Sequence, residues 1–241
     1  SGCYLEGQMA CTSCHSMHDG DPNKQVDPAR ASDAMCTGCH AEEGQDLEAH
    51  THHAPESEGS RCVQCHMPQT SYGLLMATRS HRMDGPTASG AAGRQRPNAC
   101  NLCHLDRSLG WTADHLAEWY GQERPALVDS HESLPAGAVW MLTGDGVQRA
   151  LAAWHTRWAP AREASDVETL LPALARLTQD PYSAVRQVAG DSLVALGHDV
   201  DVEALAYDPA PGPALESEPL PPATVDALWA QRDDTPASIP E

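Results

Sequence analysis

The sequence predicts a mostly α-helical fold with a large irregular part, divided near residue 110 into two regions. Three observations predict it. All nine cysteines precede residue 104, turn-forming pairs such as Asp21-Pro22 and Ala54-Pro55 recur in the same stretch, and helical spacing of apolar residues appears only later. We therefore expect a loop-rich domain over residues 1–110 and an α-helical region over residues 111–241.

Charge and hydropathy argue against several classes of partner. The chain has a net charge of -19, and residues 111–241 carry 21 acidic and 7 basic side chains. Nucleic acids and anionic membrane surfaces bind basic patches. No run approaches the roughly 18 apolar residues of a membrane-spanning helix, and no signal peptide is visible in the sequence as given. We expect no nucleic-acid partner and no transmembrane segment.

Eight of the nine cysteines form four C-x-x-C-H motifs, the attachment pattern of c-type haem. Two thiols one short turn apart reach the two vinyl groups of a porphyrin, and the following imidazole can then bind the iron. Zinc ribbons and disulfides also use C-x-x-C pairs, but neither explains a histidine after every second cysteine. The predicted haem-binding residues are Cys11, Cys14, His15, Cys36, Cys39, His40, Cys62, Cys65, His66, Cys100, Cys103 and His104.

The motifs follow one another at intervals of 25, 26 and 38 residues, which leaves no room for a separate fold around each haem. This half of the chain is rich in Gly, Pro, His and Asp, and the whole chain has no Phe. We therefore expect the four haems to replace the usual aliphatic core. Because electron tunnelling decays steeply with distance, closely packed haems would form a continuous path for electrons.

Five more histidines in this region are candidates for the second axial ligand of the irons. A second histidine closes the iron to substrates, whereas an open site favours catalysis. The predicted distal ligands are His18, His52, His53 and His81. His50 is expected to face solvent, and Arg79 and Arg82 can pair with haem propionates. Cys3 has no C-x-x-C partner and is expected to be a free thiol or an intermolecular link.

Helical patterns begin after residue 105. We expect helices over residues 111–120 and 145–158, joined by a linker over 124–135. A third helix is predicted to begin with Ser165 as its N-cap and Glu168 completing a capping box, and a fourth to open at Asp180-Pro181. A last helix over 222–231 would follow a Pro- and Glu-rich extended segment, and the tail after Asp233 is expected to be loose.

Several of these residues also carry a resemblance to a known family. Cys62-Val-Gln-Cys65-His66-Met67-Pro68, followed by Arg96-Pro97-Asn98-Ala99-Cys100 and by Trp119-Tyr120-Gly121, resembles the C-terminal part of bacterial multihaem c-type cytochromes. Asp180-Pro181-Tyr182 and the residues after it resemble a HEAT-repeat signature, so the resemblance implies a HEAT-like helical region. It also implies bis-His haems and respiratory or extracellular electron transfer.

These observations predict an electron carrier rather than an enzyme, since five candidate ligands serve four irons. The helical region is expected to be a docking surface. Redox proteins, above all other multihaem cytochromes, are the expected partners, in the periplasm or at the cell surface. One alternative is a reductase of a nitrogen or sulfur oxyanion with one open haem. Another is a subunit that joins copies of itself into a filament.

Overall fold

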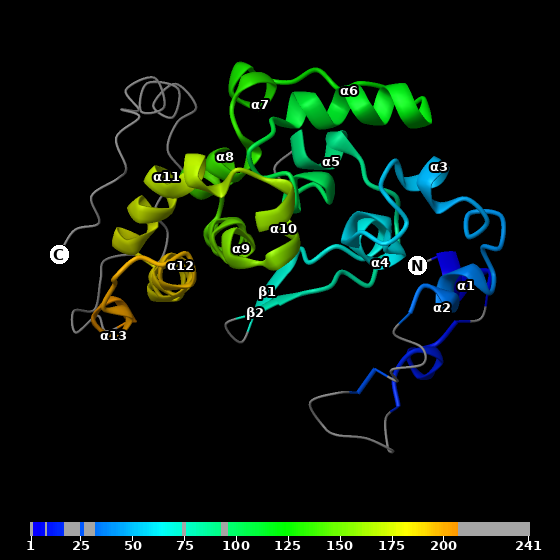
Figure 1. Ribbon diagram of the computed structural model, residues 1–241, viewed down its shortest axis with the longest axis horizontal. Coiled ribbons are helices and arrows are strands. Elements are labelled where there is room, and N and C mark those ends of the chain that lie inside the picture. Colours follow the sequence, from blue (N-terminus) through cyan, green and yellow to red (C-terminus); the bar gives the residue numbers. More distant parts are fainter. Residues whose placement is uncertain are drawn as a thin grey trace. The chain divides into compact units, whose positions relative to one another are not determined.

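The computed structural model describes residues 2–7, 9–16, 25–26, 32–73, 76–92 and 96–206, and these residues are mostly helical, with irregular loops and one small sheet (Figure 1). They form two compact units. The first comprises Ser1–Pro68 with Ser80–Gly85, and the second comprises Gln69–Arg79 with Pro86–Glu241. Three motifs therefore belong to the first unit and one to the second. His18, the predicted helix over 222–231 and the Pro- and Glu-rich segment lie outside the described residues, and the predicted domain boundary stays a prediction.

The first unit consists of loops and very short helices. Its elements are α1 (Gly2–Leu5), η1 (Cys11–Ser13), α2 (Ala34–Thr37), α3 (Leu47–Thr51), η2 (Glu58–Ser60) and α4 (Cys62–His66). Among its described residues, the buried ones are Ser60, Pro68 and Ser80. Pro68 is thus the one apolar side chain buried among the described residues of this unit, and it contributes little of the usual stabilisation from apolar burial. That haems supply the missing apolar component stays a prediction.

The second unit contains a hairpin and a set of longer helices. The strands are β1 (Ser71–Gly73) and β2 (Met76–Thr78), which pair antiparallel with Tyr72 opposite Ala77. The helices before the core are α5 (Ala88–Ala92), η3 (Cys100–Leu102), α6 (Leu109–Tyr120) and α7 (Asp129–Ser133). Those that build the core are α8 (Ala136–Thr143), α9 (Gly146–Arg157), α10 (Ala159–Ala164), η4 (Val167–Leu170), α11 (Leu171–Arg176), η5 (Leu177–Gln179) and α12 (Ser183–Ala195). The last helix, α13 (Val202–Ala206), packs against α12.

One large apolar core holds the second unit together. It lies between α8, α9, α11 and α12, and the hairpin packs beside α9 (Figure 1). Leu102 and Leu105, which flank the last cysteine of the fourth motif, are buried in the same core. The fourth motif is therefore fixed by ordinary hydrophobic packing, unlike the three motifs of the first unit.

The helix over residues 111–120 and that over 145–158 are confirmed as α6 and α9. Ser108 caps α6, and Gly121 ends it with a φ of 63°, a left-handed conformation that suits glycine. Asp145 caps α9 through the backbone N–H groups of Val147 and Gln148. Helix α8 was not predicted. Six successive residues of it, Ala136–Met141, are buried, so no amphipathic pattern marks it in the sequence.

The prediction that Ser165 caps the third helix is wrong. Asp166 caps the 3₁₀ turn η4 instead, by accepting a hydrogen bond from the backbone N–H of Glu168. The hydroxyl of Ser165 donates to the carbonyl of Cys103 at 2.6 Å and accepts from the N–H of Leu105 at 2.7 Å. A tertiary contact with the fourth motif thus replaces the local cap.

The imidazole of His155 is fully buried in α9, between the edges of Trp154 and Trp158. Its Nδ1 hydrogen-bonds to the carbonyl of Leu151 at 2.7 Å, and its Nε2 has no hydrogen-bond partner within the described residues. Burial lowers the pKa of His155 to about 4. The side chain is therefore neutral in the folded protein at physiological pH.

Acid should destabilise the second unit through His155. Its pKa in the unfolded chain is about 6.5, so the unfolded chain takes up this proton first. The free energy of unfolding should fall by roughly 3 kcal/mol as the pH falls from about 6.5 to about 4. Urea unfolding of the wild type and of His155→Leu measures this loss, because the variant lacks it. His198→Leu is the control and should lose stability in acid as the wild type does. If the wild type and His155→Leu lost the same free energy of unfolding in acid, His155 would not be the cause of that loss.

Candidate haem-attachment site

The motifs share one local backbone geometry. In the first, second and fourth motifs the carbonyl of the first cysteine accepts from the N–H of the second cysteine, at 3.2, 3.1 and 3.2 Å, and from the N–H of the histidine, at 2.9 Å in each. The third motif forms one turn of helix, α4. This turn brings both thiols and the imidazole of each motif to one side of the backbone. Each motif therefore coincides with a short helical element, η1, α2, α4 or η3.

The structure joins none of the nine cysteines, all of which are among the described residues, in a disulfide. Burial raises the pKa of the Cys65 thiol, and burial together with the charge of Asp33 raises that of Cys62 to about 12. Zinc binds the thiolate rather than the thiol. Within the described part of the chain, no cluster of three or more His, Cys, Asp or Glu side chains could hold a metal ion by itself. The raised pKa values keep Cys62 and Cys65 protonated, which is the form that zinc does not bind.

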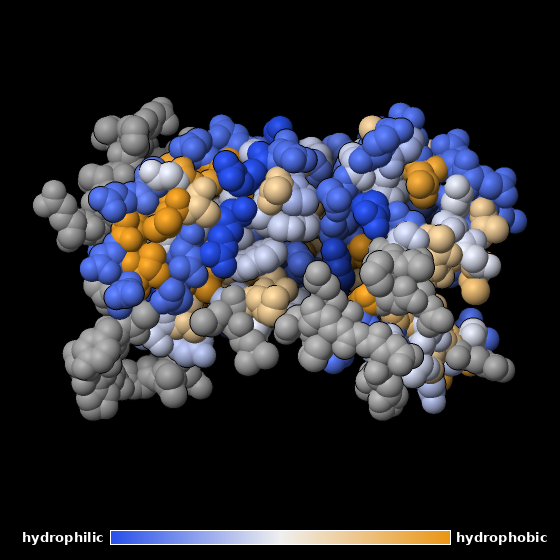
Figure 2. Space-filling view, turned by 60° about the horizontal axis from the view of Figure 1, so that its bottom comes forward, coloured by the Kyte–Doolittle hydropathy of each residue, from blue (hydrophilic) through white to orange (hydrophobic). Residues whose placement is uncertain are grey.

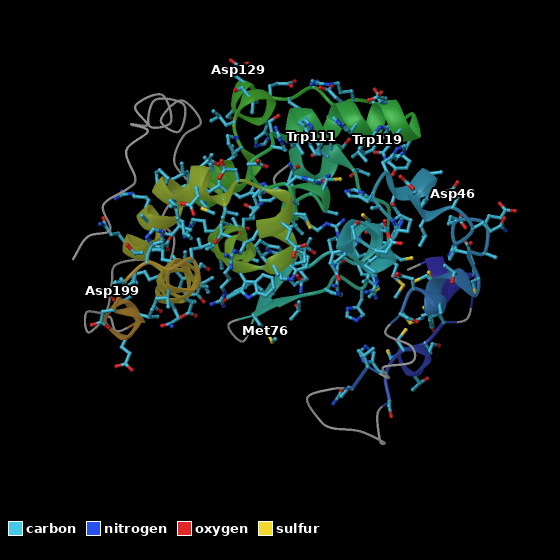
Figure 3. All side chains as sticks on the ribbon, in the orientation of Figure 1. Asp46, Met76, Trp111, Trp119, Asp129 and Asp199 are labelled. Atoms are coloured by element: carbon cyan, nitrogen blue, oxygen red, sulfur yellow. The ribbon has the colours of Figure 1, made fainter. Side chains whose placement is uncertain are left out.

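The three motifs of the first unit converge through their cysteines. The thiols of Cys36 and Cys62 hydrogen-bond to each other, and Cys14 and Cys3 lie close enough to influence the pKa of Cys36. Figure 3 shows sulfur atoms gathered around α2 and α4. Cys36 and Cys62 would therefore hold the second and third haems at neighbouring attachment points.

Asp33 links the second motif to the third. It precedes α2, its Oδ2 accepts from Nε of Arg61 at 2.8 Å, and its Oδ1 accepts from the backbone N–H of Cys62 at 3.0 Å. Cys62 is the first residue of the third motif, and Arg61 directly precedes it. A single carboxylate therefore sets the distance between two attachment sites, and the motif pattern alone did not identify it.

Removing this carboxylate should loosen the first unit. Replacing Asp33 with Asn leaves Arg61 without its ion pair and should lower the free energy of unfolding by about 1–2 kcal/mol, since the pair is partly exposed. Thermal unfolding followed in the haem Soret band measures the change. Glu43→Gln, an exposed carboxylate between the second and third motifs, is the control. Equal melting of the two variants would show that Asp33 does not hold the motifs.

Two histidine pairs face each other in the first unit. The ring centres of His15 and His81 lie 6.2 Å apart, and those of His50 and His66 lie 6.3 Å apart with nearly parallel planes. With metal–imidazole bonds of about 2 Å, as in zinc sites, two imidazoles on opposite sides of one metal have their centres roughly 6 Å apart. In each pair, the distance between the ring centres is close to that of two imidazoles bound to one metal. One member of each pair is the histidine of a C-x-x-C-H motif.

The surroundings of His66 also suit an iron ligand. Burial lowers its pKa, and its ring hydrogen-bonds to the backbone of Asp84. A neutral imidazole binds metals, and a hydrogen bond from one ring nitrogen fixes the tautomer that leaves the other for the metal. The 6.3 Å between the two ring centres and the burial of His66 therefore make His50 a candidate distal ligand. The sequence had predicted that His50 faces solvent.

The other histidines of this segment lie differently. His52 ends α3 with a φ of 57° and is exposed. The ring of His53 packs on Gly59, where a β-carbon would come within 2.3 Å of it, and its Nδ1 hydrogen-bonds to the carbonyl of Thr51 at 2.6 Å. Glycine is thus required at position 59 to keep His53 in place. The roles of His52 and His53 as ligands stay predictions, as does that of His18.

The fourth motif is held by polar side chains that the sequence did not reveal. Asn101 is fully buried, and its Nδ2 donates to the carbonyls of His104 and Arg107 at 3.3 and 3.2 Å. Its Oδ1 accepts from the hydroxyl of Thr112 at 2.8 Å. Ser165, described above, holds the backbone on both sides of His104. These contacts fix the histidine that would bind the fourth iron.

The comparisons agree with this chemistry. The doubled CXXCH motif family matches residues 5–45, which contain the first two motifs. This match supports a multihaem c-type cytochrome, and the paired motifs indicate covalently bound haem c and a part in electron transfer. Comparison with curated proteins and with solved structures gave no match. No helix among the described residues is long and apolar enough to cross a membrane.

Proposed function

We propose that this chain is a tetrahaem electron carrier, with one haem c on each motif and bis-His ligation. The observation that carries the proposal is the two pairs of facing histidines. The ring centres of His15 and His81 lie 6.2 Å apart, and those of His50 and His66 lie 6.3 Å apart. When bound, each haem would supply a one-electron Fe(III)/Fe(II) couple. The chain itself would hold each ring by two thioethers, close both faces of the iron with imidazoles, and exclude substrates from it.

The first unit supports a short path for electrons. In this unit Cys36 hydrogen-bonds to Cys62 and lies close enough to Cys14 for their charges to interact, and the unit has no buried aliphatic core within the described residues. The haems of this unit would therefore pack edge to edge and stabilise the fold as well as conduct. We propose transfer between redox proteins, such as other multihaem cytochromes, in a respiratory chain outside the cytoplasm.

The helical part of the second unit would serve as a docking or assembly surface, HEAT-like as the resemblance implies. The face of the molecule seen in Figure 2 is mainly hydrophilic with small apolar patches. With 21 acidic residues against 7 basic ones over residues 111–241, a partner with a basic surface would bind fastest.

Haem content and low-temperature electron paramagnetic resonance of the oxidised protein test the proposal. We expect one haem for each motif and low-spin signals from all of them. A high-spin signal that shifts when nitrite or sulfite is added would indicate an open iron and favour a reductase instead. If the protein carried no haem after expression under conditions that attach c-type haem, both the carrier and the reductase functions would be excluded.

A further inference from the structure

A column of aromatic rings runs along α6 and starts at the histidine of the fourth motif. The ring centre of His104 lies 5.1 Å from that of Trp111, which lies 4.4 Å from that of His115. His115 lies 4.6 Å from Trp119, and Trp119 lies 6.4 Å from Tyr120. Figure 3 shows Trp111 and Trp119 towards opposite ends of the same helix. We refer to these five rings as the α6 column.

Helical spacing produces the column. Trp111, His115 and Trp119 are four residues apart, so they share one face of α6. The hydrogen bond of His115 Nδ1 to the carbonyl of Trp111, at 3.0 Å, fixes the central ring. The helix packs into the unit through another face, formed by Leu109, Ala113 and Leu116. The column is thus not the face that anchors α6, and Trp111, His115 and Trp119 stay half-buried while Tyr120 is 44% exposed.

We propose that the α6 column is the electron entrance and exit of the fourth haem, and this proposal rests on the proposed function. Packed rings couple two redox centres better than solvent does, because tunnelling decays more slowly through contacting atoms than across gaps. The column joins an iron ligand, His104, to the exposed ring of Tyr120. In one transfer, the iron changes from Fe(II) to Fe(III) and an external one-electron carrier gains the electron. The rings neither gain nor lose an electron overall.

Light-driven electron injection tests this path in the holoprotein. A ruthenium polypyridine photosensitiser is attached to Glu123→Cys, just beyond the column, in a Cys3→Ser background that removes the other free thiol. After a flash, the excited sensitiser gives one electron to ferric haem, and absorbance reports the rate. His115→Leu and Trp119→Leu should each slow this rate by an order of magnitude or more.

Two matched variants separate the path from damage to the fold. His115→Phe keeps a ring in the column and should retain most of the parental rate. Tyr182→Leu removes an exposed ring from the start of α12, outside the column, and should change nothing. Parental rates in both leucine variants would overturn the proposal, and so would an equal loss in His115→Phe and His115→Leu.

Mass spectrometry of the Cys100–Cys103 peptide distinguishes the two proposals. A haem on this peptide together with unchanged rates in the leucine variants overturns the path alone. A peptide without haem overturns the tetrahaem assignment and the path together.

Discussion

Replacing His50 with alanine is expected to convert one haem of the oxidised protein from low-spin to high-spin. His50 faces His66 at 6.3 Å, so its loss would leave the third iron with one axial imidazole, and five-coordinate ferric haem is high-spin. One haem in each protein molecule should change its spin state completely, and electron paramagnetic resonance quantifies the amount of high-spin haem directly. His81→Ala should do the same to the first haem, since His81 faces His15 at 6.2 Å.

The matched control for this prediction is His52→Ala, two residues away and exposed. We expect it to leave the spin state of the third haem unchanged. If His52→Ala produced the high-spin haem and His50→Ala did not, His50 and His66 would not be an axial pair. The distal ligand would then be His52, as the sequence predicts.

Breaking the ion pair between Arg149 and Asp180 is expected to give the largest loss of stability in the second unit. The side chains are 10% and 5% exposed, and Nε of Arg149 donates to Oδ2 of Asp180 at 2.7 Å. Removing one partner leaves a buried charge without compensation, which costs about 3–5 kcal/mol. Arg149→Met should therefore lower the free energy of unfolding by that amount in urea titrations.

A double variant tests the physical reason. Arg149→Met with Asp180→Leu removes both charges and should recover much of the loss, because two apolar side chains avoid the desolvation penalty. Arg176→Ala, an exposed arginine of the same unit that hydrogen-bonds to Gln179, should change stability by less than about 1 kcal/mol. A single variant no worse than Arg176→Ala would show that the buried pair contributes little.

Asp180 takes part in both a local turn and a tertiary contact. The pair Asp180-Pro181 predicted a helix start, and α12 begins at Ser183, two residues later. The carboxylate accepts from the backbone N–H of Tyr182 at 2.9 Å, as a local turn would require. It also accepts from Arg149 of α9, thirty-one residues earlier, which the sequence pattern could not indicate.

Among the helices, local signals predicted the boundaries of α6 and α9 to within two residues. Asp145 directly precedes α9 and Gly121 directly follows α6, so neighbouring residues were sufficient to identify these caps. Ser165 carries the same kind of local signal, but it does not cap the third helix. Its hydroxyl instead hydrogen-bonds to backbone groups of the fourth motif region, 60 and 62 residues away. Helix α8 was missed because its buried residues show no alternation with polar ones.

The sequence by itself predicted where haem attaches, because two thiols and an imidazole within five residues carry that chemistry, and the paired motifs indicate covalently bound haem c. It also indicated that the cysteine-rich half lacks an aliphatic core. Only the tertiary structure decided that His50 faces His66, that Asp33 joins the second motif to the third, and that the fourth motif belongs with the helices. Those relations join residues that are distant in the chain, and they depend on the path of the backbone between them, which local spacing does not encode.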